Sequence, residues 1–253
     1  MIRWEKTLVA FVVSFMVFSA ATVRADLLTG TAVLYTTGSI IHDGVPVNNI
    51  YITPILATNH TTGQDPFLLF CGDFKTPTSP AFNPSGGGQE YDAFAIGSPV
   101  MPLYSDWQKN TITDLFRHAY HVAFDPDENV IDSVYAQAIQ LAIWSILHET
   151  PGNYDILGGS FHLSSSYIDL AVITATNNLL SAAIGDITWA SMGLTDFVPY
   201  NLTVYIADGG TQVSQTFISI TAPVVPEPAT MLILGGGLVG LGWVRWRLKR
   251  AEN

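Results

Sequence analysis

The sequence is poor in cysteine, in basic residues and in charge of either sign. Its 253 residues include one cysteine, so no disulfide can form within the chain and no cysteine-rich zinc or iron–sulfur site is possible. Charged residues make up 12%, with 10 Lys and Arg against 21 Asp and Glu, for a net charge of −11. Nucleic-acid-binding domains carry basic surfaces, so this balance argues against nucleic acid as a partner.

The few basic residues are concentrated at the two ends of the chain. Between Asp26 and Pro226 only three cations stand among 18 acidic residues, which gives that stretch a net charge of −15. The three are Lys75, Lys109 and Arg117. An excess of acidic side chains keeps a protein soluble without naming a partner. We therefore expect the central part to be an exported domain with a solvated acidic surface.

The first 25 residues predict a secretory signal peptide. Arg3 and Lys6 precede the apolar run Leu8–Ala21, and Val23-Arg24-Ala25 offers small side chains where a signal peptidase reads them. We expect signal peptidase to cleave after Ala25. The alternative is an uncleaved N-terminal anchor.

Residues 223–253 have three parts in a fixed order. Pro226-Glu227-Pro228 is followed by the apolar stretch Ala229–Val244, which contains five glycines, and then by a basic tail that includes Arg245 and Arg247. The apolar stretch has 16 residues, whereas about 20 are needed for a comfortable transmembrane span. By the positive-inside rule the basic tail would stay in the cytoplasm. Composition alone predicts a short C-terminal membrane helix, that is, a plain tail anchor.

This order of motif, glycine-rich helix and arginine-rich end resembles the PEP-CTERM sorting signal over roughly the last 29 residues. The resemblance implies that the helix holds a precursor in the inner membrane of a Gram-negative bacterium. It also implies an exosortase-type enzyme that processes the chain near Pro226, Glu227 and Pro228. The mature protein would then reach the cell surface or the extracellular matrix, in an organism that makes extracellular polysaccharide.

Residues 26–222 predict one α+β domain, with β-rich N- and C-terminal parts around a central helical lobe. Short runs rich in β-branched and aromatic residues predict strands at Thr31–Tyr35, Asn49–Pro54 and Phe67–Cys71. A turn at Asp208-Gly209-Gly210 predicts a closing hairpin near the end of the domain.

Three helices are predicted between the β-rich parts. The first runs from about Leu115 to Phe124, and the second begins at the start signal Asp125-Pro126-Asp127-Glu128 and ends before Pro151. The third runs from about Ser166 to Gly185. The second helix is apolar over most of its circumference, which is typical of a buried helix.

Two residues do not suit an ordinary core. Cys71 follows the apolar run Phe67–Phe70, and a lone thiol in an exported protein has no internal partner and is liable to oxidation. Gln140 stands in the middle of the predicted buried helix, where an amide without hydrogen-bond partners costs about 1–3 kcal/mol. Each has a plain explanation, an inert core cysteine and a satisfied structural amide.

The segments around these two residues resemble the paired motifs of bacterial thioester domains, which occur in surface adhesins of Gram-positive bacteria. Phe70-Cys71-Gly72-Asp73 matches an aromatic-Cys-aliphatic-Asp/Asn motif except at Gly72, where an aliphatic residue is usual. The helical segment Ile139–Trp144, with Gln140, Ala142 and Trp144, matches an apolar-Gln-x-Ala-apolar-Trp motif. The resemblance implies a thioester-domain-like fold, with Phe70, Asp73, Ala142 and Trp144 around the reactive pair.

In that family the cysteine sulfur and the glutamine side-chain carbonyl form an internal thioester with loss of ammonia. The resemblance implies such a cross-link between Cys71 and Gln140, and covalent attachment to an amine- or hydroxyl-bearing protein or polysaccharide. We expect the apolar side chains of Phe70, Ile139 and Ile143 to line the site and to keep water from the acyl group. The protein would be a single-use tether with no turnover, not an enzyme, and it would need no cofactor.

Two other functions remain open from the residues alone. One is a non-reactive structural exoprotein associated with exopolysaccharide, with the same sorting signal. The other is a cysteine hydrolase that pairs Cys71 with a histidine, His118, His121 or His148. His118 and His121 stand three residues apart but lack a third ligand, so no metal site is predicted. The sequence has no phosphate-binding glycine loop and no serine nucleophile elbow.

Overall fold

The computed structural model describes residues 24–32, 37–74, 88–98, 103–125, 128, 130–149, 151, 154, 156–164, 168–207 and 215–221. The chain separates into two compact units, Met1–Ile220 and Thr221–Asn253. The predicted signal peptide, apart from Arg24 and Ala25, and the whole predicted sorting signal lie outside the described residues. No described helix is long and apolar enough to cross a membrane.

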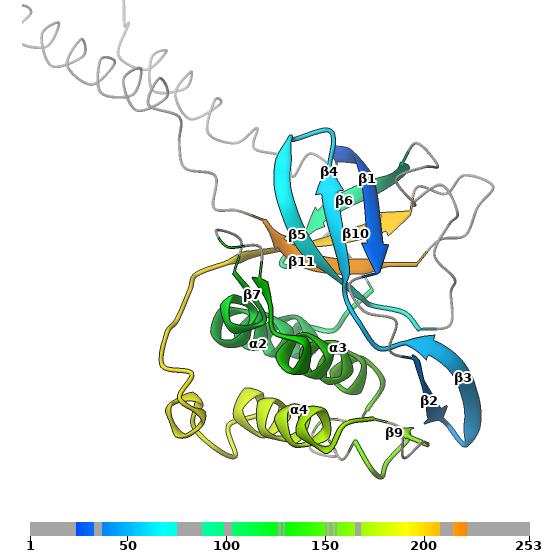
Figure 1. The fold of residues 1–253 in the computed structure, drawn as a ribbon, viewed down its shortest axis with the longest axis vertical. Helices are drawn as coiled ribbons and strands as arrows, with labels where there is room; N and C mark the ends of the chain where they lie inside the picture. Colours follow the sequence, from blue (N-terminus) through cyan, green and yellow to red (C-terminus); the bar gives the residue numbers. More distant parts are fainter. Residues whose placement is uncertain are drawn as a thin grey trace, which may run out of the picture. The chain divides into compact units, whose positions relative to one another are not determined.

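A closed β-barrel forms one half of the first unit (Figure 1). The strand order around it is β1-β4-β5-β11-β10-β6, and β1 pairs antiparallel with both β4 and β6. The strands are β1 (Arg24–Ala32), β4 (Ile55–Asn59), β5 (Gln64–Cys71), β6 (Gln89–Ala95), β10 (Asn201–Ala207) and β11 (Phe217–Thr221). Because β10 and β11 come from the end of the domain, the barrel joins strands from both β-rich parts of the sequence.

Three α-helices of the described chain pack together beside the barrel (Figure 1). They are α2 (Asp106–Ala123), α3 (Ser133–His148) and α4 (Leu170–Ala183). Each begins at a side-chain cap: Ser105 forms a capping box with Gln108, while Asp132 and Asp169 accept hydrogen bonds from the first turns of α3 and α4. The α+β class predicted from sequence is confirmed.

Smaller elements connect the barrel and the helices. A three-stranded sheet has the order β3-β2-β9, built from β2 (Thr37–His42), β3 (Val45–Tyr51) and β9 (Phe161–Leu163). Strands β7 (Phe124–Asp125) and β8 (Val130–Ile131) pair between α2 and α3, and a 3₁₀ helix η3 (Trp189–Met192) follows α4.

Two hydrophobic clusters form the core, and the strands and α3 contribute to both. The first contains Phe70, Phe116, Ala142 and Ile143, and the second contains Cys71, Phe74, Trp144 and Phe161. Successive residues of a strand point to opposite faces, so Phe70 and Cys71 enter different clusters. Helix α3 lies between the clusters and buries every side chain from Ala136 to Ile146.

The predicted starts of two helices were wrong. Helix α2 begins at Asp106, before the predicted Leu115, because the capping box of Ser105 and Gln108 starts it earlier. Helix α3 begins at Ser133 and not at Asp125, because Val130–Ile131 pairs as a strand with Phe124–Asp125 before Asp132 caps the helix.

Other predicted boundaries shifted by a few residues. Helix α4 begins at Leu170 rather than near Ser166. The first predicted strand overlaps β1 (Arg24–Ala32) only at Thr31 and Ala32, and its remaining residues, 33–35, lie outside the described residues. The second predicted strand overlaps the end of β3, which ends at Tyr51, before Pro54. The two strands of the predicted closing hairpin, β10 and β11, are neighbours in the barrel, and its predicted turn at Asp208-Gly209-Gly210 lies outside the described residues.

Candidate functional site

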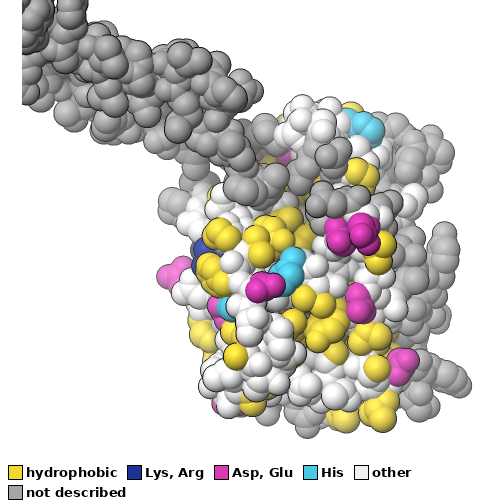
Figure 2. Space-filling view, turned by 60° about the vertical axis from the view of Figure 1, so that its left-hand side comes forward, with side chains coloured by type: hydrophobic (Ala, Val, Ile, Leu, Met, Phe, Trp, Pro, Cys, Tyr) yellow, Lys and Arg dark blue, Asp and Glu magenta, His cyan; other side chains and the backbone are white. Residues whose placement is uncertain are grey.

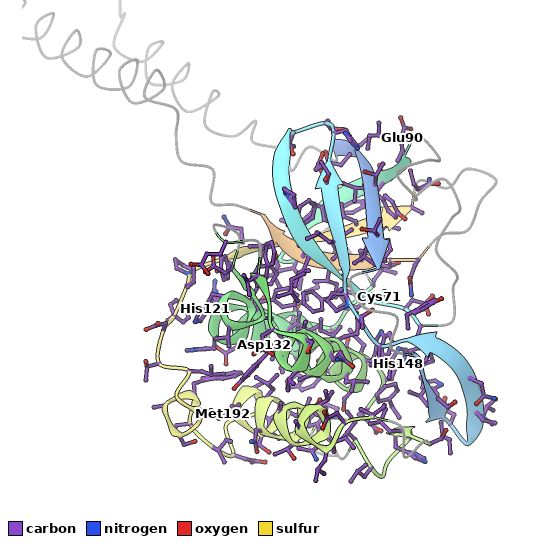
Figure 3. The ribbon with its side chains drawn as sticks, viewed as in Figure 1. Cys71, Glu90, His121, Asp132, His148 and Met192 are labelled. Carbon is purple, nitrogen blue, oxygen red and sulfur yellow. The ribbon has the colours of Figure 1, made fainter. Side chains whose placement is uncertain are left out.

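Cys71 is the last residue of β5, where the barrel meets the helices (Figure 3). The four residues before it, Phe67–Phe70, are buried, and Cys71 itself is 5% exposed. It lies opposite Phe217 of β11. At Gly72 the chain leaves the strand, and the Gly72 N–H donates to the carbonyl oxygen of Thr216 at 2.8 Å. The position of the thiol is therefore fixed by the barrel on one side.

Gln140 reaches Cys71 from the middle of α3. Its side chain is fully buried, and it exchanges two hydrogen bonds with the Cys71 backbone. The Cys71 N–H donates to Gln140 Oε1 at 2.8 Å, and Gln140 Nε2 donates to the Cys71 carbonyl oxygen at 2.8 Å. The structure thus brings together the two residues that the sequence motifs single out.

This arrangement has the parts that an acyl transfer from nitrogen to sulfur needs. The Cys71 N–H already donates to Oε1, the atom on which negative charge develops when a nucleophile attacks the side-chain carbonyl carbon. Burial, together with the negative charge of Asp73, raises the pKa of the Cys71 thiol to about 12. The thiol is therefore protonated at neutral pH and carries the proton that a departing ammonia requires.

Aromatic rings share the second core cluster with Cys71. Phe74, three residues after Cys71, lies with its ring centroid 5.6 Å from that of Trp144 and 5.7 Å from that of Phe161. Phe74 and Trp144 are 5% and 1% exposed, so they exclude water from this cluster. The motif comparison named Trp144 but missed Phe74, although Phe74 follows Cys71 closely in an otherwise small and polar segment.

The other residues expected around the site lie in different places. Phe70 and Ala142 belong to the first cluster together with Ile139 and Ile143, on the opposite face of β5 from Cys71. These residues pack the barrel onto the helices, and the cluster that contains Cys71 is lined by Phe74 and Trp144 instead. Asp73 is half-buried, and its carbonyl oxygen accepts a hydrogen bond from the Gln215 side chain.

The candidate histidines lie in two places: His118 and His121 on α2, and His148 at the end of α3 (Figure 3 labels His121 and His148). His148 belongs to the aromatic group of the second cluster, with its ring centroid 4.6 Å from that of Phe74. His118 and His121 lie on α2, and His118 stacks on Trp189 at 4.7 Å. Burial lowers the pKa of His121. His148 stands eight residues after Gln140, which corresponds to about 12 Å along a helix.

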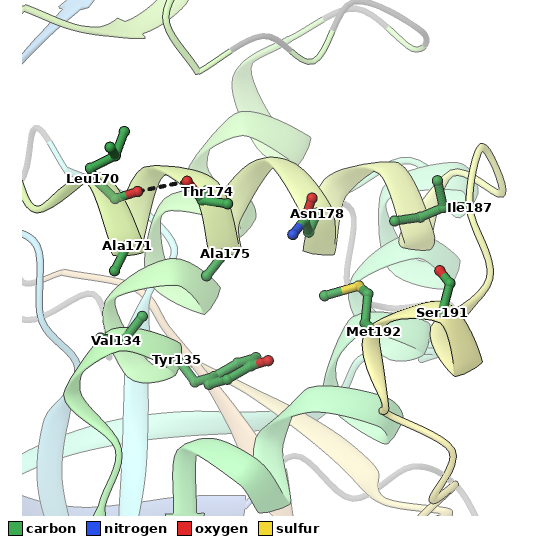
Figure 4. A pocket seen from close by; sticks show the side chains of 10 residues that line it. All are labelled: Val134, Tyr135, Leu170, Ala171, Thr174, Ala175, Asn178, Ile187, Ser191 and Met192. Carbon is green, nitrogen blue, oxygen red and sulfur yellow. Dashed lines mark hydrogen bonds between the residues drawn. The ribbon is translucent and has the colours of Figure 1, made fainter.

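Within the part of the chain that the structure describes, no group of three His, Cys, Asp or Glu side chains is arranged to hold a metal ion. A groove of about 660 Å³ lies between α3, α4 and η3 (Figure 4). Tyr135, Asn178 and Met192 line it, and the Thr174 hydroxyl at its edge donates to the Leu170 carbonyl oxygen. The groove includes neither Cys71 nor Gln140, so it is separate from the reactive pair.

One face of the described chain carries more acidic than basic side chains. Figure 2 shows acidic side chains at several places on one face, with Lys and Arg only at its left-hand edge. Lys109 is 14% exposed and lies 3.7 Å from Asp106. Few amines of the described chain are therefore available on this face.

Comparison with known proteins gives one short family match and similarity to solved structures. Residues 224–247 match the family described as the PEP-CTERM protein-sorting motif, and no curated protein matches the chain. The fold is similar to the N-terminal domain of the Streptococcus pyogenes pilus tip adhesin Cpa. The identity is 14% and the TM-score 0.45, over 80% of this chain and 95% of that one.

It is also similar to the N-terminal thioester domain of the fibronectin-binding protein SfbI from the same species. That match has 13% identity and a TM-score of 0.40, and it covers 73% of this chain and 93% of that one. The family match over residues 224–247 confirms the predicted PEP-CTERM motif. The motif is that of an exported, sorted cell-surface protein.

Proposed function

We propose that this protein is a cell-surface or matrix tether that forms a thioester between Cys71 and Gln140 and couples once to an amine- or hydroxyl-bearing partner. The observation that carries the proposal is the pair of 2.8 Å hydrogen bonds between the Gln140 amide and the Cys71 backbone. They hold the amide carbonyl against the backbone of the residue that carries the only thiol of the chain, and Cys71 shares a buried core cluster with Phe74 and Trp144.

The chemistry of the proposed step balances without a cofactor. Cys71 Sγ attacks the side-chain carbonyl carbon of Gln140, the bond to Nε2 breaks, and the thiol proton leaves with the nitrogen as ammonia. Holding the two groups in contact replaces a bimolecular encounter by an intramolecular one, which lowers the barrier. Attack by an outside amine or hydroxyl later breaks the thioester, acylates the partner at Gln140 and frees the thiol.

The sorting signal supports a site of action outside the cell. In the proposal the precursor is held in the inner membrane of a Gram-negative bacterium by residues 223–253 after signal peptidase removes residues 1–25. An exosortase-type enzyme then acts near Pro226, Glu227 and Pro228. The acceptor is a protein or polysaccharide at the cell surface or in the surrounding matrix.

Intact-protein mass spectrometry tests the proposal on the full chain, purified in mild detergent at mildly acidic pH. We expect a mass short of one ammonia, addition of one methylamine after treatment, and a newly alkylatable Cys71. A folded protein with its full calculated mass would reject the thioester and leave a sorted acidic exoprotein with a structural cysteine. Repeated turnover of a small ester would instead support a cysteine hydrolase.

A further inference from the structure

The groove between α3, α4 and η3 contains polar groups that the protein itself leaves unpaired. Figure 4 shows Tyr135 on the α3 side, Asn178 on the α4 side and Met192 on the η3 side of one open space. Among the described residues, neither the Tyr135 hydroxyl nor the Asn178 amide has a hydrogen-bond partner. A phenol both donates and accepts hydrogen bonds, and a primary amide has two N–H donors and an oxygen acceptor. Two walls of the groove therefore offer hydrogen bonds to a ligand.

The lining of the groove is uncharged, although the chain around it is acidic. Among the described residues that line it, none is Asp, Glu, Lys, Arg or His. The exposed residues Asp169 and Asp186 directly precede the lining residues Leu170 and Ile187. An anion would therefore meet no cation in the groove and would be repelled by the carboxylates beside it. A charged ligand of either sign would lose its hydration without an ion-pair partner in the lining. The groove suits an uncharged ligand.

The rest of the lining is mostly apolar, with Ala171, Ala175 and Met192 among its residues. A purely apolar occupant, such as the apolar face of a helix, would bury the Tyr135 hydroxyl and the Asn178 amide without partners, which is unfavourable. An occupant with uncharged hydroxyl groups on a C–H framework satisfies both parts of the lining. Saccharides have this chemistry, because hydroxyl groups surround each ring and C–H groups cover its faces.

We propose that this groove binds an uncharged saccharide chain, with Tyr135 and Asn178 as the residues that hydrogen-bond to it. Its volume of about 660 Å³ lies within the range of about 300–1,000 Å³ that is typical of ligand sites. The groove contains neither Cys71 nor Gln140, so this binding is reversible and separate from the proposed thioester. The inference goes beyond the proposed function, since it gives the protein a second, non-covalent way to hold a neutral polysaccharide.

Isothermal titration calorimetry of the full chain in mild detergent tests the inference. The probes are neutral hexasaccharides of glucose, of mannose and of galactose, and a hexagalacturonate of the same length supplies the anionic comparison. We expect at least one neutral hexasaccharide to bind and the hexagalacturonate not to bind, because the lining has no cation. Cys71→Ala, which cannot form a thioester, should bind the same hexasaccharide with the affinity of the wild type.

Substitutions in the groove assign the binding to it. Tyr135→Phe and Asn178→Ala should each weaken binding of the neutral hexasaccharide by about 3- to 10-fold, the effect of one lost hydrogen bond. Their unfolding midpoints should not fall, because neither polar group has a partner within the described chain. Tyr51→Phe and Asn177→Ala are matched controls. Neither residue lines the groove, so both variants should keep the affinity of the wild type.

Asn178→Leu separates a saccharide from an apolar occupant. It replaces the amide by an apolar side chain of similar size, so saccharide binding should weaken at least as much as in Asn178→Ala. An apolar helix or a second copy of the chain would instead bind more tightly. Self-association that increases in Asn178→Leu, measured by sedimentation, would assign the groove to a second copy and reject the saccharide.

Three further results would overturn the inference: no binding of any neutral hexasaccharide, equal binding of the hexagalacturonate, or wild-type affinity in both Tyr135→Phe and Asn178→Ala. The proposed thioester is judged separately by mass. A wild type that keeps its ammonia but binds the hexasaccharide rejects the thioester and supports this inference. A wild type that loses ammonia and binds none of the neutral probes rejects this inference alone.

Discussion

Cys71 and Gln140 stand 69 positions apart in the sequence and exchange two buried hydrogen bonds of 2.8 Å each. Both polar groups of the Gln140 amide are thereby satisfied by the backbone of one residue. The same contact satisfies the Cys71 N–H and carbonyl at the point where β5 ends. The pair therefore has a structural role as well as the proposed chemical one, and the two roles can be measured separately.

Removal of the Gln140 amide should destabilise the fold even when no thioester can form. In a Cys71→Ala background, Gln140→Ala leaves the backbone N–H and carbonyl of residue 71 buried without partners. Each such group costs about 1–3 kcal/mol, so for two groups we expect the free energy of unfolding to fall by roughly 2–6 kcal/mol. Urea denaturation of the single and double variants measures it. Equal midpoints would mean that the amide contributes nothing to stability.

Variants of the same two residues also test the proposed thioester chemistry. Cys71→Ala and Gln140→Ala should each abolish coupling to a small primary amine, because one removes the sulfur and the other the carbonyl. Intact mass before and after methylamine measures the coupling. Continued uptake of amine by Gln140→Ala would show that another carbonyl is the electrophile.

The free thiol of Cys71 should make stability depend on pH in the alkaline range. Burial and Asp73 raise its pKa from 9.0 to about 12 in the folded protein. Above pH 9 the unfolded chain loses this proton while the folded chain keeps it, so the folded state binds more protons and is destabilised as pH rises.

The expected slope is about −1.4 kcal/mol per pH unit between about pH 9 and 12, with the full stability present below pH 9. The free energy of unfolding is measured by denaturation at several pH values. The methylamine-treated protein, in which the thiol is free, is compared with Cys71→Ala. Parallel curves for the two proteins would refute the assignment of the shift to Cys71.

Phe74 should protect the thioester from water. Phe74→Leu keeps an apolar side chain but removes the ring that contacts Trp144 and Phe161, so it opens the site on that side. We expect faster spontaneous hydrolysis, followed as gain of one water by mass, and faster alkylation of Cys71. Phe116→Leu, in the other core cluster, is a control of equal size change. Equal hydrolysis rates in both variants would show that Phe74 does not protect the thioester from water.

The N-cap of α3 should contribute to the stability of the helix that carries Gln140. Asp132 accepts hydrogen bonds from the N–H groups of Val134 and Tyr135 at 2.9 and 3.1 Å. Asp132→Ala should cost about 0.5–2 kcal/mol, whereas Asp132→Asn should cost much less because asparagine also caps helices. Thermal unfolding of the two variants distinguishes them, and an equal loss in both would point to charge rather than capping.

The sequence alone determined the features that depend on local order. The three-part C-terminal signal, the buried character of the helix around Gln140 and the short motif around Cys71 are all patterns within a few residues or turns. Helix ends were less well predicted where two signals competed. Asp125-Pro126 has the residues of a helix start, but the β-branched pair Val130–Ile131 forms a strand there, and Asp132 caps the helix instead.

Only the tertiary structure decided which distant residues meet. The barrel joins β5 to β11, and α3 packs against it, so Gln140 reaches Cys71 while Phe74 comes to lie in the same core cluster as Cys71. Phe70, although adjacent to Cys71 in sequence, points to the other face of the strand and enters the other core cluster. Local periodicity sets which face a side chain takes, but the partner on that face depends on strand order and helix packing across the whole domain.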